Sequence, residues 1–591
     1  MRCVALCALF AATLATAQSP GQFPTGRSFV VKPTATGKRM MVTSAHPLAT
    51  AAGLTMLERG GSAVDAAIAV QLVLGLVEPQ SSGIGGGAFL MHFDARRKLL
   101  AAYDGRETAP SGADERLFLD AGGKPLPFGV AVVGGRSVGV PGVLRMAELA
   151  HQRHGRLPWR SLFAPAIRLA ERGFPVGEQL HRWLGADPRL RADHNAFALF
   201  YNHDGTPRAA GTLVRNPAYA QVLRAVSIHG PDRFYTGDNA LAMVAAVRGH
   251  AANPGQLLLK DLAGYTPKPR EPLCFDYRAH VICSMPPPSS GGIALAQMLG
   301  MLEHTGFDQA APMSADAVHL FAEAGKRAFA DRNLYVADPD FVAVPRGLTD
   351  RDYLAQRARG IGPVASAAAQ AGQPPGATLS LAPDRSPELP STSHLSIVDA
   401  RGNAVSMTST IETVFGAHLM VNGYLLNNQL TDFSFIATEN GRPVANRVEA
   451  GKRPRSSMTP VLVFERRPDG TRGSLVLISG SPGGSAIINY VAKTLVASLD
   501  WKLPLQEVLS LPNFGSRNLG PNGTLELEAG RAAPALVERL TAMGHEVREL
   551  DLASGVHAIE RVCRDAGARP LHNCVWVGAA DPRREGLAAG R

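Results

Sequence analysis

Apolar and polar residues follow two different periods along this chain. Between residues 41 and 80, "HPLATAAGLTMLERGG" and "SAVDAAIAVQLVLGLVEP" have the Ala-rich apolar spacing of helices. The first segment ends on paired glycines and the second begins with a capping serine, as helix ends commonly do. Alternation in "GAFLMHFDARRKLLAAYDG" predicts two strands about a polar turn. From about residue 141 to 360 the helical pattern prevails, with Pro- and Gly-rich connections.

The sharpest change of pattern comes at residues 363–391. This stretch is rich in Pro, Ala and Ser and has no period, which predicts a mobile, protease-accessible loop. Directly after it, "HLSIVDARGNAVSMTST" predicts a strand, a tight turn at residues 399–403 and a second strand. A mobile loop that leads straight into a core strand is an unusual junction. It is understandable if the chain is cut there.

The N-terminus has the pattern of an export signal. Arg2 is followed by an apolar stretch from Cys3 to Leu14 and by the A-x-A cleavage pattern of residues 15–17. The alternative is a buried N-terminal helix. Because the apolar stretch is too short to span a bilayer, we expect residues 1–17 to be a signal peptide. The mature protein is then periplasmic or secreted, without a membrane anchor.

Composition and charge narrow the class of protein only moderately. Apolar residues make up 45% and charged residues 19% of the 591 residues, which excludes wholesale disorder. This length allows two to four ordinary domains or one large layered domain. The net charge of +10 comes from scattered residues, with no Lys/Arg run interleaved with aromatics. A solvated basic surface is therefore favoured over a nucleic-acid site.

The cysteines fall into close pairs. Two of the six lie in the predicted signal; Cys274 and Cys283 flank a predicted hairpin, and Cys563 and Cys574 form a second pair. Disulfides formed in an oxidising compartment are one interpretation, and free cysteines in the core are the other. Neither pair has the spacing or the histidines of a zinc site, so no metal is expected.

Three hydroxyl residues, Ser391, Thr392 and Ser393, stand at the predicted junction. A hydroxyl residue with a free α-amine can use that amine as its own base, because the amine has a pKa of about 8 rather than the ~10.4 of lysine. Cleavage is needed to expose the amine. Taken alone, Ser-Thr-Ser after prolines is more typical of a linker.

The surrounding motifs carry a family resemblance. In order and spacing, the chain resembles γ-glutamyltranspeptidases through "SSGIGGGAFL", "GRETAP", "MPPPSSGG", "TSHLSIVDARGNAVSMTSTIETVFGA", "LLNNQLTDFS", "GKRPRSSMTP" and "SGSPGGS". The resemblance implies an α+β fold, the four-layer αββα sandwich of N-terminal-nucleophile hydrolases. It also implies a heterodimer of a large chain, residues 18–391, and a small chain, residues 392–591, with no cofactor.

The resemblance assigns the catalytic residues. Thr392 matches the nucleophile, and Thr410 matches the threonine that orients it. Gly483 and Gly484 match the paired glycines whose N–H groups form the oxyanion hole. Two glycines suit this task, because they let the backbone approach a developing negative charge.

A second set of residues matches the binding site for the γ-glutamyl group. Arg106 matches the arginine for the α-carboxylate, and Ser456 and Ser457 match the serine pair that assists it. Asp432 matches the carboxylate that pairs with the α-ammonium, and Gln429 its neighbour. Each of these residues, taken alone, is more typical of a surface charge or a turn.

Two positions depart from the family pattern. Glu412 stands where many relatives have asparagine, and it brings a second negative charge near the donor site. The stretch between residues 432 and 456 lacks the tyrosine that closes the pocket in some relatives, which predicts a more open pocket. Both departures bear on which acyl groups are accepted.

Three hypotheses follow. The first is a γ-glutamyltransferase and glutathione hydrolase that takes γ-glutamyl donors such as glutathione and passes the acyl group to water, amino acids or peptides. The second is an acylase of the same fold for glutaryl side chains, which Glu412 favours and Asp432 disfavours. The third is a catalytically inactive secreted scaffold or binding module. A further motif, "GRSVG" at residues 135–139, fits the G-x-S-x-G pattern but is a weak match in a chain with 61 glycines.

Overall fold

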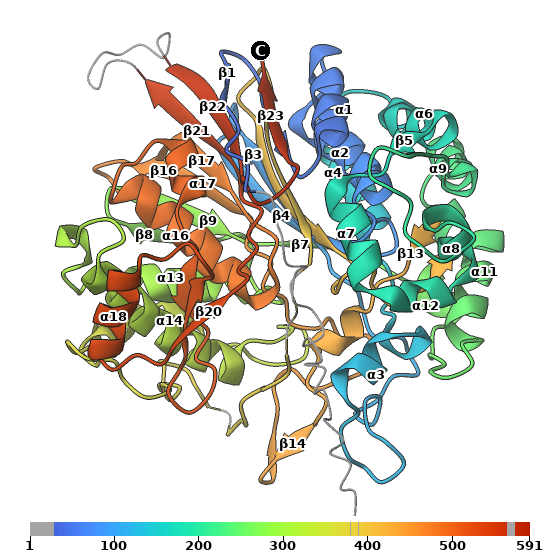
Figure 1. Cartoon of the computed structure of the whole chain (residues 1–591). Helices are drawn as coiled ribbons and strands as arrows, with labels where there is room; N and C mark the ends of the chain where they lie inside the picture. The colour runs from blue at the N-terminus through green and yellow to red at the C-terminus, as the bar shows by residue number, and fades with distance from the viewer. Residues whose placement is uncertain (1–28, 379, 388, 390, 564–573) are drawn as a thin grey trace, which may run out of the picture.

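The computed structural model describes residues 29–591 except 379, 388, 390 and 564–573. The predicted signal peptide lies outside the described residues. Two antiparallel seven-stranded sheets stack in the middle of the molecule, and helices cover the outer face of each (Figure 1). This is the αββα sandwich that the family resemblance implied, and the prediction of fold is confirmed.

The first sheet contains the strands around the predicted junction. Its order is β23 (Leu587–Gly590), β2 (Met41–Ser44), β10 (Ser393–Val398), β11 (Ala404–Thr410), β3 (Gly87–Asp94), β4 (Leu99–Gly105) and β7 (Lys268–Arg270). The turn between β10 and β11 is closed by the Asp399 side chain, which accepts from the N–H groups of Arg401 and Asn403 at 2.8 and 3.0 Å. The predicted strand–turn–strand unit is confirmed.

The second sheet packs on the inner face of the first. Its order is β1 (Ala35–Gly37), β22 (Cys574–Ala580), β21 (His557–Cys563), β17 (Arg472–Ser479), β16 (Val461–Arg466), β9 (His280–Ser284) and β8 (Leu273–Tyr277). Both sheets contain strands from either side of residue 392. Disulfides join Cys274 to Cys283 and Cys563 to Cys574, so the alternative of free core cysteines is wrong.

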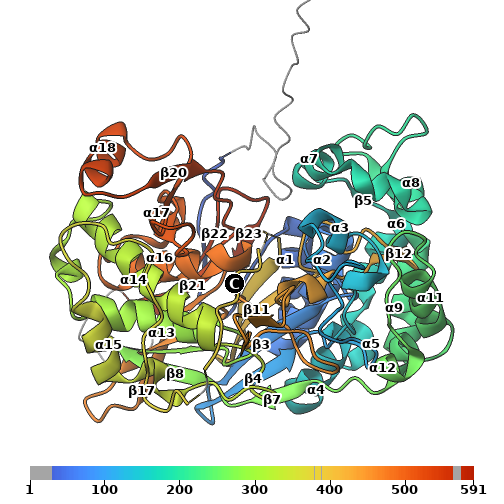
Figure 2. The same cartoon turned by 90° about the horizontal axis from the view of Figure 1, so that it is seen from below.

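Side chains alternate between two cores, as the period of the strands requires. In β3, Leu90 packs with the helices on the outer face of the first sheet, whereas Phe89 and Met91 pack between the sheets. The outer helices of the first sheet include α1 (Pro47–Glu58), α2 (Ala63–Val77) and α4 (Val143–His154). The second sheet is covered by α13 (Gly291–Leu302), α14 (Ala315–Tyr335) and α16 (Ile487–Leu499), on the opposite side of the molecule (Figure 2).

The middle of the chain is helical, as predicted. Its remaining helices are α5 (Trp159–Leu162), α6 (Ala164–Arg172), α7 (Glu178–Ala186), α8 (His194–Phe200), α9 (Pro217–His229), α10 (Asp232–Tyr235), α11 (Gly237–Arg248), α12 (Leu259–Ala263) and α15 (Arg351–Ala358). Ser62 caps α2 by accepting from the Asp65 N–H, and Asp65 accepts from the Ser62 N–H in return, which confirms the predicted cap. No helix in the described part of the chain is long and apolar enough to cross a membrane.

The described residues of the stretch 363–391 have the predicted irregular backbone, but the expectation of an accessible loop is wrong at its C-terminal end. Asp384 is buried and accepts hydrogen bonds from Arg455 and Asn446 at 2.9 and 2.8 Å. Ser391 and Thr392 are only 2% and 4% exposed. Composition describes the local backbone, whereas this burial comes from tertiary contacts that composition does not encode. A separate protease therefore has no ready access to the predicted cleavage point.

Candidate active site

Thr392 stands at the entrance to β10 and meets the end of β11. Its Oγ donates to the Thr410 Oγ at 3.0 Å, and that oxygen also accepts from the Glu412 N–H at 2.8 Å. Gly86 makes room for this corner, since a Cβ there would lie 2.1 Å from the Thr410 carbonyl oxygen. The two predicted threonines are therefore in direct contact, and the acceptor holds the Thr392 hydroxyl in one direction.

The peptide bond before Thr392 lies against the paired glycines. The Gly483 N–H donates to the Ser391 carbonyl oxygen at 3.1 Å. Gly483 has a φ of +137°, and a Cβ there would lie 2.5 Å from the Tyr490 ring, so only glycine fits. A helical turn begins at Gly484 and runs on into α16. The N–H groups at such a helix start are directed outward and favour negative charge.

Thr392 itself has a strained backbone. Its φ is +100°, a conformation that β-branched residues rarely adopt and that costs about 1–3 kcal/mol. Hydrogen bonds on both sides maintain this conformation: the Ser391 hydroxyl donates to the Gln80 carbonyl oxygen at 3.0 Å, and β10 begins at Ser393. The strain therefore sits at the bond that is predicted to break.

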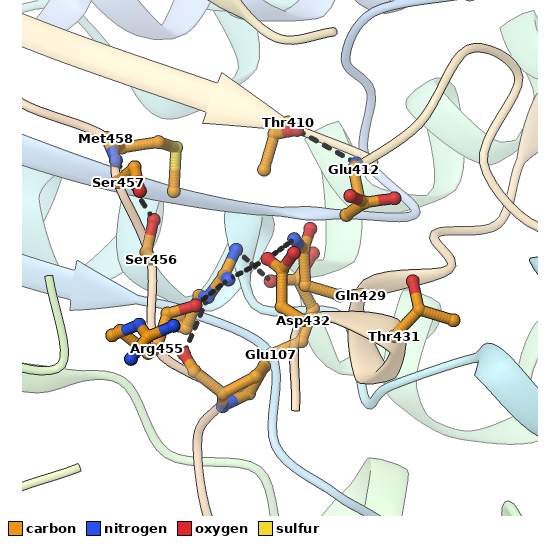
Figure 3. A network of polar contacts seen from close by, with 12 residues as sticks. Glu107, Thr410, Glu412, Gln429, Thr431, Asp432, Arg455, Ser456, Ser457 and Met458 are labelled. Carbon is orange, nitrogen blue, oxygen red and sulfur yellow. Dashed lines mark hydrogen bonds and ion pairs between the residues drawn. The ribbon is translucent and has the colours of Figure 1, made fainter. Parts of the chain in front are cut away.

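The predicted receptors for the two charges of a γ-glutamyl group lie side by side. The Arg106 guanidinium pairs directly with the Asp432 carboxylate, and the Gln429 amide donates to the same carboxylate at 2.7 Å (Figure 3). Arg106 is 1% exposed and is also held by the carbonyl oxygens of Pro454 and Arg455 at 3.2 and 2.9 Å. This arrangement matches an amino acid head group, in which a carboxylate and an ammonium are also neighbours.

The serine pair is positioned by the upstream "MPPPSSGG" motif. Ser290 donates to the Ser456 carbonyl oxygen through its N–H and its hydroxyl, both at 2.7 Å. Arg332, from α14, donates to the Ser457 hydroxyl at 2.6 Å and to the Ser290 hydroxyl at 2.8 Å. Arg332 was not predicted, because in the sequence it is one of several charged residues in a long helix.

Two buried carboxyl groups lie beside this ion pair. Burial, and next to it the Asp432 carboxylate, raises the pKa of Glu412 well above its ordinary value, and the Asn428 amide donates to Glu412 at 2.5 Å. Burial likewise raises the pKa of Glu107 to about 8, although an Arg106 nitrogen lies 3.7 Å from it. Glu107 was not singled out in the sequence, where nothing distinguishes it from a surface glutamate.

A small cavity brings these residues together. It has a volume of about 20 Å³, room for one or two water molecules. It is lined by nine of the ten predicted site residues, together with three others: Arg106, Thr392, Thr410, Glu412, Gln429, Asp432, Ser456, Ser457 and Gly484, with Leu389, Met458 and Ile487. The tenth, Gly483, contacts the site through its bond to Ser391. Leu389 precedes the predicted cleavage point, so the uncut chain itself fills part of the site.

Two other groups of residues lie outside the site. Ser137 of the G-x-S-x-G match donates its hydroxyl to the carbonyl oxygens of Val132 and Gly134, which is a structural role. His319, Glu323 and His545 bring three possible metal-ligating side chains within 4.8 Å of one another. Glu323, however, is already paired with Lys326 and Arg327, both at 2.8 Å.

The fold and the threonine at the start of β10 define an N-terminal-nucleophile hydrolase. Comparison with known proteins identifies its family: the family model for gamma-glutamyltranspeptidase matches residues 49–591 of the sequence. The chain is 35% identical to a glutathione hydrolase proenzyme of Bacillus subtilis, over 94% of this chain and 92% of that protein. It is also 35% identical to the acylase ACY 1 proenzyme of a Pseudomonas species, over 89% and 91% of the two chains.

Solved structures agree with this assignment. The cephalosporin acylase of Bacillus halodurans has a TM-score of 0.80 at 26% identity, covering 95% of this chain and 97% of that one. A chain of the Helicobacter pylori γ-glutamyltranspeptidase has a TM-score of 0.53 at 32% identity, covering 56% and 94%. The protein belongs to the γ-glutamyltranspeptidase family, and the resemblance read from its motifs is confirmed.

Proposed function

We propose that this chain cuts itself between Ser391 and Thr392 and then uses Thr392 to cleave and transfer γ-glutamyl groups. The observation that carries this proposal lies at the uncut bond. The Gly483 N–H donates to the Ser391 carbonyl oxygen, and Thr410 aligns the Thr392 hydroxyl. The attacking group and a donor for the developing oxyanion are thus present before cleavage. The products are a large chain of residues 18–391 and a small chain of residues 392–591.

Self-cleavage proceeds as an acyl shift followed by hydrolysis. The Thr392 Oγ bonds to the Ser391 carbonyl carbon, and its proton passes to the Thr392 nitrogen as the C–N bond breaks. The acyl group is then an ester on Oγ, and the nitrogen is a free amine. Water hydrolyses the ester, which gives the Ser391 carboxylate and restores the Thr392 hydroxyl. The strain at Thr392 favours this step, because breaking the bond releases it.

In turnover the new amine takes the proton from the Thr392 hydroxyl, which attacks the γ-carbonyl of a donor such as glutathione. The tetrahedral oxyanion accepts from the N–H groups of Gly483 and Gly484, and the leaving amine takes up the proton. Water, or the amine of an amino acid or peptide, then attacks the γ-glutamyl ester on Thr392. Loss of one such N–H donor typically costs about 3 kcal/mol of transition-state stabilisation.

Donor recognition uses the charges that line the cavity. Arg106, with Ser456 and Ser457, binds the α-carboxylate, and Asp432 with Gln429 binds the α-ammonium. The direct Arg106–Asp432 pair supports this assignment, because each receptor satisfies the charge of the other until a substrate replaces both contacts. The Leu389 segment must leave before a γ-glutamyl group fits.

A glutaryl acylase is the second candidate, favoured by the 35% identity to an acylase proenzyme. A glutaryl group has no ammonium, so Asp432 and Glu412 would face a bare methylene chain. Such a substrate takes water away from two carboxyl groups and brings no cation to balance them, so Glu412, like Asp432, disfavours it. The structure supports γ-glutamyl donors, and export to the periplasm or outside the cell remains our proposal from the N-terminal pattern.

Two measurements test the proposal. N-terminal sequencing of the small band on a denaturing gel should read Thr-Ser-His-Leu; Ser-Thr-Ser would move the nucleophile to Ser391. Rates on γ-glutamyl and glutaryl anilides, measured with the same preparation, should favour the γ-glutamyl compound by at least tenfold. A single uncut band without activity would instead support the inactive scaffold.

A further inference from the structure

Both residues that flank Thr392 are held by one loop of the predicted large chain, between α2 and β3. On one side the Ser391 hydroxyl donates to the Gln80 carbonyl oxygen at 3.0 Å. On the other, the Ser393 hydroxyl donates to the Glu78 carboxylate at 3.1 Å, and the Ser82 hydroxyl donates to Ser393 at 3.1 Å. The backbone nitrogen of Thr392 lies between these two attachments. This nitrogen becomes the base in the proposed function.

One carboxylate oxygen of Glu78 has no hydrogen-bond partner among the described residues. The Glu78 side chain is fully buried, and its other carboxylate oxygen accepts from Ser393. The charged groups that act on it come from both ends of the chain: Arg584 and Lys32 favour its ionised form, and Glu585 opposes it. Burial outweighs them and raises the pKa of Glu78 to about 7. A buried carboxyl group with a spare acceptor is costly unless a donor arrives.

Cleavage supplies such a donor. The Thr392 nitrogen changes from an amide with one N–H to an α-amine with a pKa of about 8, which is largely an ammonium at neutral pH. A buried ammonium needs a counter-ion. The carboxyl groups on the cavity side are already engaged, Asp432 with Arg106 and Glu412 with Asn428. Glu78 is linked through Ser393 to the residue next to the new terminus.

We propose that Glu78 is the counter-ion of the α-ammonium that forms on Thr392 when the chain is cut, and that it positions this amine beside the nucleophile. This inference rests on the proposed self-cleavage. Glu78 is a positioning residue, because it does not contact the substrate. Its negative charge stabilises the protonated amine, whereas the unprotonated amine is the active base. The acid limb of the activity profile therefore lies at a higher pH with Glu78 than without it.

The test measures the amine directly, independently of any substrate. Purified, cut enzyme is treated with acetic anhydride over a range of pH, and acetylation of the Thr392 amine is quantified by mass spectrometry of the N-terminal peptide. In Glu78→Gln, which keeps an acceptor for Ser393 but loses the charge, the amine should titrate about one pH unit lower than in the wild type. At a pH below the titration point of the variant's amine, the unprotonated fraction should be about tenfold larger in Glu78→Gln than in the wild type. The value of kcat/KM on a γ-glutamyl anilide should rise by the same factor, with little change in KM.

Glu585→Gln is the matched control, since Glu585 also acts on Glu78 but its carboxylate accepts from the Glu178 N–H and not from β10. Its amine titration should stay within a few tenths of a unit of the wild type. An unshifted titration in Glu78→Gln overturns the proposal. If Glu78→Gln remains uncut, Ser393→Ala replaces it, because this variant removes the link to β10 and keeps the charge. A half-unit fall is then expected, and no change overturns the inference. A wild type that is cut but inactive on γ-glutamyl anilide contradicts the proposed function and leaves this test intact.

Discussion

Thr410 is the residue on which the direction of the Thr392 hydroxyl depends. It accepts from Thr392 and from the Glu412 N–H, so its own position is fixed by the backbone that follows it. Thr410→Val keeps the shape and removes the acceptor. We expect cleavage and kcat to fall about 10- to 100-fold, the loss of roughly 1.5–3 kcal/mol. Gel densitometry over time and initial rates measure both.

Thr410→Ser is the control for this change, because it retains the hydroxyl and loses only a methyl group. It should remain within about threefold of the wild type. Equal loss in the valine and serine variants would show that packing of the methyl group, and not the hydrogen bond, is what matters at this position.

The raised pKa of Glu412 predicts that KM changes with pH in opposite directions for γ-glutamyl and glutaryl donors. Burial and the Asp432 carboxylate raise its pKa well above the ordinary value, so it is protonated at low pH and ionises as the pH rises. Ionisation adds an attraction for a substrate ammonium and a repulsion for an acyl chain that carries only a carboxylate. KM for a γ-glutamyl anilide should therefore fall with rising pH, and KM for a glutaryl anilide should rise. Glu412→Gln should remove both trends; if they persist, another group causes them.

At the scale of single elements, the turn between β17 and α16 depends on a glycine at position 483. Gly483 has a positive φ and no space for a Cβ against Tyr490. In Gly483→Ala the added Cβ should displace the N–H that serves both reactions. We therefore expect self-cleavage and turnover each to fall about 100- to 1000-fold. Rates of processing and of anilide hydrolysis in one preparation test this link. Loss of one activity without the other would separate the two roles.

Gly470→Ala is the matched control for a glycine with positive φ. Gly470 has a φ of +80° in the turn between β16 and β17, with open space where its Cβ would stand. This substitution adds the backbone strain without touching the oxyanion site. It should cost about 1 kcal/mol of stability and leave both reactions unchanged.

Helices and strands could be predicted from the sequence where a hydrophobic period or a helix-capping residue marked them. The Ser62 cap of α2 and the alternation through β10 and β11 are local signals, and the structure confirms both. The proximity of Arg106 to Asp432 is not a local signal, and it was predicted only because family motifs carry tertiary information. Arg332 and the burial of Ser391 were missed, since each depends on contacts between segments that lie far apart in the chain.

The segment before the cleavage point is anchored by Asp384. Its carboxylate forms a buried ion pair with the guanidinium of Arg455, the residue that directly precedes the serine pair. Asp384→Asn removes the negative charge of this buried ion pair, and breaking such a pair typically costs about 3–5 kcal/mol. We expect a melting temperature lower by several degrees and a higher KM for γ-glutamyl donors. Arg385→Ala is the control: its ion pair with Glu439 is exposed, so it should change stability by less than about 1 kcal/mol.

At the scale of the whole molecule, the chain is interleaved across the cleavage point. In the first sheet, β10 and β11 lie between β2 and β3, so strands of the predicted small chain pair on both sides with strands of the large chain. In the second sheet, β9 pairs with β16 in the same way. Neither chain contains all the strands of either seven-stranded sheet. A sequence period cannot reveal this, because it describes which face of a strand is buried and not which strand lies beside it.

The interleaving predicts that the two chains behave as one folding unit after cleavage. The disulfides Cys274–Cys283 and Cys563–Cys574 each lie within one predicted chain, so neither of these bonds joins the two chains. A non-reducing denaturing gel should therefore show two bands, whereas size-exclusion chromatography under native conditions should show one species. In urea, loss of the shared sheets and separation of the chains should occur in the same transition, because separating them exposes both cores. Chains that separate while their circular dichroism remains native would contradict this, since each would then possess a core of its own.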